Sequence, residues 1–169
     1  LNAAARISFR IKVDQGTPVR AAVLDAEGVW HVAATYLDAS GGGCSQPALA
    51  YKNDDWVKRL AEVRGKIWRH LGKDQATLRF SIRHPMDTGL ADGIPAFYVE
   101  NLKLTDSAGK TLGRLTVHEP VSENPTITVY PFIKQTIDKI QIKGRDNEGN
   151  LFKASVPVPV TSTRLQTRK

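Results

Sequence analysis

The chain has 169 residues, of which 41% are hydrophobic and 24% are charged, as is ordinary for a globular protein. No apolar run approaches the roughly 18 residues of a membrane-spanning helix, so we expect no helical membrane span. A single cysteine excludes an intramolecular disulfide and leaves a free thiol, a covalent adduct or an intermolecular bridge, including a dimer linked through that residue.

The formal net charge is +7, but the excess of cations is not gathered in one long block. The strand-like stretches of the sequence are close to neutral, and residues 161–169 contain Arg164, Arg168 and Lys169 without any acidic residue. A nucleic-acid-binding module concentrates Lys and Arg on one folded face. The distribution therefore favours a solvated surface over nucleic-acid binding, and it predicts a disordered basic tail over 161–169.

The N-terminal part of the chain predicts about three β-strands. Residues 6–13 alternate strictly between polar and apolar side chains, the pattern of a half-buried strand. Residues 19–24 and 29–37 predict two more strands, with a turn between them at 25–28. Three strands cannot close a sandwich alone, so this part predicts a partial sandwich unit.

A glycine-rich arm follows these strands and leads to the cysteine. Gly41, Gly42 and Gly43 immediately precede Cys44. Glycine loses more conformational freedom on ordering than any other residue, so three in succession predict a flexible arm rather than a core segment. The arm indicates a thiol offered for covalent attachment of a thiol-reactive group. The alternative is an exposed cysteine that has no function.

Residues 53–72 predict an amphipathic helix. Apolar side chains recur there at helical spacing, at Trp56, Leu60, Val63, Ile67 and Leu71. Asn53 or Asp54 can cap its start, and Gly72 is a natural stop. We expect residues 53–75 to be a helical linker between two β units.

Strand signals return from residue 77 onwards. Their roughly even spacing, with turn residues between them, predicts an antiparallel sandwich over residues 76–160. The candidate strands are residues 77–83, 95–105, 111–117, 125–133, 137–145 and 150–160. Pro157 and Pro159 lie two residues apart in the last of them, which predicts an edge strand because proline cannot donate to a ladder.

Neither a catalytic site nor a metal site is predicted. His84 and Met86 could bind copper, but no second His or Cys lies at ligand spacing, which favours a structured loop. Ser122 and Glu123 have no base oriented by a third group, which nucleophilic catalysis requires.

Several short motifs in the second half resemble one family. They are His84-Pro85-Met86-Asp87-Thr88-Gly89, Ile94-Pro95, Val121-Ser122-Glu123-Asn124-Pro125 and Arg145-Asp146-Asn147-Glu148-Gly149-Asn150. Residues 76–160 with these motifs resemble the Z subunit of the bacterial sulfur-oxidation carrier SoxYZ. Residues 1–47, here placed in a unit over 1–52, resemble the C-terminal half of its Y subunit. The order is similar to that of fused SoxYZ-like carriers associated with quinoprotein dehydrogenases.

The resemblance implies two immunoglobulin-like β-sandwiches, the first one partial here, and a periplasmic location. It implies a non-enzymatic carrier without a cofactor, in which Cys44 holds sulfur intermediates such as those from thiosulfate, and residues 41–43 are the arm. The implied partners are sulfur-oxidising enzymes, c-type cytochromes or a quinoprotein dehydrogenase. The alternative function is a non-carrier accessory module for such a dehydrogenase.

Overall fold

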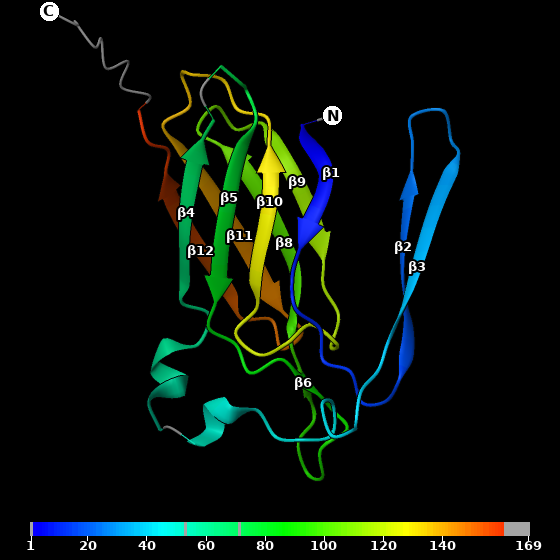
Figure 1. The fold of residues 1–169 in the computed structure, drawn as a ribbon. Helices are drawn as coiled ribbons and strands as arrows, with labels where there is room; N and C mark the ends of the chain where they lie inside the picture. Colours follow the sequence, from blue (N-terminus) through cyan, green and yellow to red (C-terminus); the bar gives the residue numbers. More distant parts are fainter. Residues whose placement is uncertain (1, 53, 71, 161–169) are drawn as a thin grey trace, which may run out of the picture.

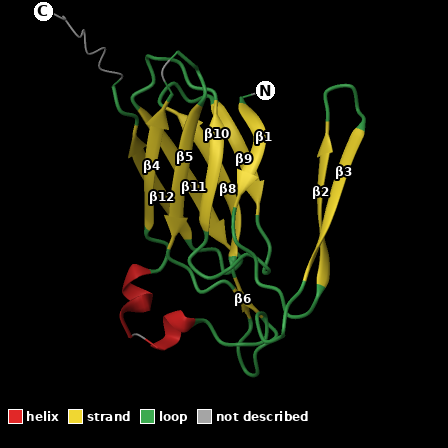
Figure 2. Ribbon diagram, viewed as in Figure 1, coloured by secondary structure: helices red, strands yellow, loops and turns green. Residues whose placement is uncertain are grey.

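The computed structural model describes residues 2–52, 54–70 and 72–160, and its centre is a sandwich of two four-stranded antiparallel sheets (Figures 1 and 2). The first sheet has the order β1 (Ala3–Ser8), β10 (Thr126–Pro131), β5 (Ala76–Ile82) and β4 (Val63–Arg69). The second has the order β12 (Leu151–Pro157), β11 (Lys139–Asp146), β8 (Val99–Asp106) and β9 (Thr111–Thr116). A short pair, β6 (Asp87–Thr88) and β7 (Ala96–Phe97), lies outside both sheets.

The core lies between the two sheets because each strand buries alternate residues. In β5, Leu78, Phe80 and Ile82 are at most 1% exposed, and the residues between them face outwards. Ile140 and Ile142 of β11 supply the opposite layer and are fully buried. Each such side chain contributes about 1.5–3 kcal/mol of hydrophobic stabilisation. The sandwich is therefore a stable platform for the loops at its ends.

The N-terminal strands divide between two structures. β1 pairs with β10 and forms an edge of the first sheet, so it joins the sandwich of the second half. β2 (Thr17–Leu24) and β3 (Trp30–Leu37) pair in register as a separate hairpin that stands beside the sandwich in Figure 1. Every residue of β3 is exposed.

The predicted helix over residues 53–72 is wrong. The structure has two short 3₁₀ helices, η1 (Leu49–Lys52) and η2 (Asp54–Arg59), followed by strand β4. Gly65, a weak point in a helix, lies within β4. A Cβ atom there would lie 2.8 Å from Val156 Cγ2, so the close approach of β12 requires glycine. In place of the helical linker expected over 53–75, the structure therefore has a short 3₁₀ helix, an edge strand and a turn.

The strands predicted after residue 76 are confirmed within a few residues at their ends. β12 is an edge strand, as the proline spacing predicted. The basic tail over 161–169 lies outside the described residues. Within the described part of the chain, we find no helix that is long and apolar enough to cross a membrane.

Candidate functional site

Cys44 lies in the loop that follows β3, and the local backbone explains the glycines before it. Gly41 and Gly42 have φ angles of 102° and 83°, in the left-handed region that favours glycine. Gly43 lies against the backbone of Val13, where a Cβ atom would be 2.4 Å from the carbonyl oxygen. The three glycines thus allow the loop to turn and to pack against the segment that precedes β2.

Asp14 ties this loop to the start of the hairpin. Its Oδ1 accepts hydrogen bonds from the Gly42 amide at 3.0 Å, the Cys44 amide at 3.4 Å and the Ser45 hydroxyl at 3.4 Å. The last two are long, and a typical net contribution is about 0.5–1.5 kcal/mol per bond. The carboxylate therefore organises the turn around Cys44, with the Gly42 bond as its firmest contact.

Strand β6 forms a second support under the loop. The Thr88 hydroxyl donates to the Cys44 carbonyl, and it accepts from the Leu90 amide at 3.2 Å. The neighbouring Asp87 is 3% exposed and accepts from the Tyr51 hydroxyl. The segments on either side of residues 45–50 are thus both hydrogen-bonded to β6, so the position of the Cys44 main chain is fixed.

The Cys44 side chain is half-buried, and its thiol is free. Burial raises the pKa of this thiol, the Asp14 carboxylate raises it further, and Lys12 lowers it. Lys12 Nζ is held nearby by the Met86 carbonyl. Because the thiolate is the nucleophile, the site as described favours a protonated, slowly reacting thiol at neutral pH.

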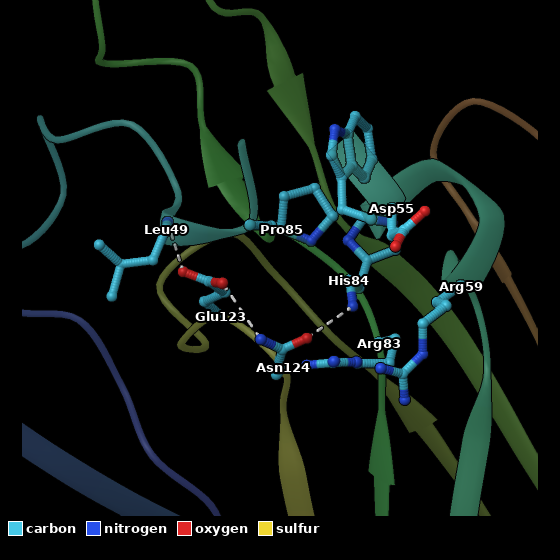
Figure 3. A pocket seen from close by; sticks show the side chains of 10 residues that line it. Leu49, Asp55, Arg59, Arg83, His84, Pro85, Glu123 and Asn124 are labelled. Atoms are coloured by element: carbon cyan, nitrogen blue, oxygen red, sulfur yellow. Dashed lines mark hydrogen bonds between the residues drawn. The ribbon is translucent and has the colours of Figure 1, made fainter. Parts of the chain in front are cut away.

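A cavity of about 220 Å³ lies beside η1 and η2 (Figure 3), at the end of the sandwich where these short helices lie in Figure 1. Glu123 accepts from the Leu49 amide at 2.7 Å and from Asn124 Nδ2 at 3.1 Å. Asn124 in turn accepts from the His84 amide at 3.3 Å. These bonds hold the segment after Cys44 against the sandwich, which is a structural role for Glu123. Cys44 does not line this cavity.

His84 and Met86 are both buried and make hydrogen bonds within the chain. His84 is 1% exposed, its Nδ1 accepts from the Met86 amide at 3.1 Å, and its Nε2 lies 3.6 Å from Asp146 Oδ2. Burial lowers the pKa of His84 to about 4, although the Asp146 charge opposes the shift. The Met86 sulfur accepts from the Val99 amide. We find no group of three or more metal-ligating side chains in the described ranges.

The structure brings together only some of the residues singled out in the sequence. Cys44 and the three glycines share one loop, whereas His84 and Ser122 lie elsewhere. Two contacts of the loop, Asp14 and Thr88, could not be found from the sequence pattern. Asp14 lies between the strands predicted over 6–13 and 19–24, and acidic residues in such connections commonly accept backbone amides, which is the one signal in the sequence.

Comparison with known families gives two matches in chain order. Residues 68–157 are similar to the family described as "Sulphur oxidation protein SoxZ". Residues 1–44 are similar to the family described as "Sulfur oxidation protein SoxY". The second match ends on Cys44 itself. A comparison with curated proteins found no match.

Proposed function

Because the chain belongs to the SoxZ family and carries a SoxY-like segment ahead of it, we propose that this sulfur-oxidation protein is a carrier. Cys44 holds a sulfur-containing group covalently and presents it to partner enzymes in the periplasm. The chain itself is not an enzyme in this proposal. The partners are sulfur-oxidising enzymes and the c-type cytochromes that accept their electrons.

One observation supports the proposal above the others: the SoxY-like match ends on the only cysteine of the chain. That cysteine lies in a loop, half-buried, with a free thiol. A cysteine with a purely structural role usually packs as a small apolar side chain within a core. Cys44 is not a member of the buried core described above.

The attachment step is an oxidation. The Cys44 thiol and thiosulfate lose one proton and two electrons as the new S–S bond forms, which leaves a cysteine S-thiosulfonate. A two-electron oxidant, or two one-electron acceptors such as c-type cytochromes, must receive the electrons. A thiol reductant cleaves the same bond and restores the thiol.

A second candidate function is an accessory module for a quinoprotein dehydrogenase, in which Cys44 carries nothing. The contacts of the loop favour this candidate, because Asp14 and Thr88 both hold the main chain around Cys44. A raised thiol pKa also suits an unused thiol better than a nucleophile. The mobility of residues 41–43 stays a prediction that separates the two candidates.

Intact mass measurement tests the carrier proposal. The purified chain is incubated with thiosulfate and two equivalents of ferricyanide, and we expect one adduct that dithiothreitol removes. Cys44→Ser is the matched control and must remain unmodified. If the native chain gains no reversible adduct while the urea-unfolded chain reacts, the thiol is intact but inaccessible in the folded protein. That result would refute the carrier proposal.

Capture from periplasmic extract tests the second candidate. A dehydrogenase or cytochrome that binds the native chain and Cys44→Ser equally would support an accessory role. Loss of the same partner in Cys44→Ser would instead support the carrier.

A further inference from the structure

The outer face of the second sheet carries four cations in one line. Lys153, Lys143, Lys103 and Arg114 lie on β12, β11, β8 and β9, one on each strand. Register pairs Lys143 with both Lys153 and Lys103, and it pairs Lys103 with Arg114. We call these four residues the basic row. The sheet that bears them lies behind the first sheet in Figure 1.

All four side chains of the basic row face away from the core. On β11 the flanking Ile142 is fully buried, and on β8 the flanking Leu102 and Leu104 are each 2% exposed. Strands alternate their side chains between the two faces, so the residues between these apolar positions point outwards. Neighbouring strands lie about 4.8 Å apart, so the row extends across about 14 Å of the sheet.

The basic row lowers folding stability. Like charges directly opposite each other on neighbouring strands are destabilising. Among the described residues, no acidic side chain pairs with any member of the row. On the same face, by contrast, Arg145 forms an ion pair with Glu100 at 2.7 Å. The unpaired row therefore points to a counter-charge from outside the chain.

On the outer face of the first sheet, two of the cations have a partner within the chain. Lys66 Nζ lies 5.4 Å from the centre of the Trp68 ring. Arg64 pairs with Glu62 at 2.7 Å. Lys66 also faces another cation, Arg79, across the strands β4 and β5. This pair gives a matched control on the opposite side of the sandwich.

We propose that the basic row is the docking surface for an acidic protein partner, whose carboxylates lie along the row. The surface belongs to the sandwich and does not depend on the chemistry of Cys44. On one side of the row the outer-face positions are polar, namely Ser155, Gln141 and Thr105, and on the other side lie Asn101, Arg145 and the exposed Leu151. Lys153, Lys143 and Arg114 are exposed and Lys103 is half-buried, so the row can meet a flat protein surface.

The same face does not fit a nucleic acid. Proteins that bind single strands stack bases on aromatic rings, and the outward positions of β8, β9, β11 and β12 contain no aromatic residue. The duplex major groove admits a helix or a two-stranded ribbon, which a flat four-stranded face is not. An acidic protein is therefore the partner that the charge and shape both favour.

Binding of poly-L-glutamate of about 50 residues tests this surface, with the full chain kept reduced in low-salt buffer. We expect fluorescence anisotropy to show binding that salt weakens. The double variant Lys103→Gln with Lys143→Gln should bind about tenfold more weakly, or about threefold for each cation removed. The control variant Lys66→Gln with Arg79→Gln loses the same charge and should change affinity less than about twofold.

The alternatives give different results. Equal losses in the two double variants, or no loss in either, would show that only net charge matters and would overturn the proposal. Tighter binding of a 20-nucleotide oligothymidylate, with the same dependence on the row, would assign the face to nucleic acid instead. The midpoint of urea unfolding distinguishes a docking role from a structural one. The variant Lys103→Gln with Lys143→Gln should keep or raise this midpoint, because it removes repulsion between like charges. A lower midpoint together with unchanged binding would refute docking.

Discussion

We expect that replacing Asp14 changes the rate at which an alkylating reagent reacts with the Cys44 thiol. Asp14→Ala removes one acceptor from three donors, at 3.0, 3.4 and 3.4 Å. The two long bonds contribute little, so we take the total as about 1–2 kcal/mol of loop attachment. That change increases the population of the detached loop about 5- to 30-fold. If the thiol reacts from the detached loop, its alkylation rate should rise by the same factor.

Asp14→Asn separates the charge from the hydrogen bonds. The amide oxygen still accepts from the loop, but the negative charge that raises the Cys44 pKa is gone. A single charge beside a partly exposed group is worth about 0.2–1 kcal/mol, so we expect only about a threefold faster reaction at pH 7.5. Lys12→Gln should slow the reaction, because Lys12 lowers the same pKa.

The assay is the rate of iodoacetamide addition under native conditions, followed by intact mass, with the urea-unfolded chain as the upper limit. Asp25→Ala is the matched control, because Asp25 also accepts backbone amides, from Glu27 at 3.0 Å and Val29 at 2.8 Å, but at the far end of the hairpin. Its rate should equal that of the unaltered chain. Identical rates for Asp14→Ala, Asp14→Asn and the unaltered chain would refute the idea that attachment of the loop limits access to the thiol.

Three further outcomes follow from the same geometry. Gly43→Ala places a Cβ atom 2.4 Å from the Val13 carbonyl oxygen, so the loop cannot dock and alkylation should accelerate as in Asp14→Ala; an unchanged rate would contradict the packing. Tyr51→Phe removes a donor from the buried Asp87 and should lower the free energy of unfolding in urea by about 1–3 kcal/mol. The pKa of His84 is lowered to about 4, so the unfolded chain binds this proton more tightly. The unfolding free energy should therefore fall as pH drops from about 6.5 to about 4, and in His84→Gln this part of the slope should be absent.

Most of the sandwich could be predicted because its strands show a period of two. β5 buries alternate residues over Ala76–Ile82, close to the predicted residues 77–83. The same reasoning failed at β4, because Val63 and Ile67 lie four residues apart. That spacing places two side chains on one face of a helix and also on one face of a strand. Gly65 between them was the signal that favoured the strand.

The sites depend on information that local sequence does not carry. The basic row joins Arg114, Lys103, Lys143 and Lys153, which only strand register brings into line. Along the chain these cations are spread over a region that is close to neutral, so the sequence alone does not show the face that they share. The attachment of Cys44 to Asp14 likewise joins residues 30 positions apart, across the whole hairpin.

The hydrogen bond from Gly42 to Asp14 also joins the hairpin to the loop that contains Cys44. The chain enters β2 just after Asp14 and leaves β3 shortly before Gly42, so the bond between these residues clamps the two ends of the hairpin together. The Cys44 loop is therefore bonded on one side to the base of the hairpin and on the other, through Thr88, to β6 below the sandwich. The exposed Trp30 lies at the far end of this hairpin, so a partner that binds there would be joined to the Cys44 loop through the two strands.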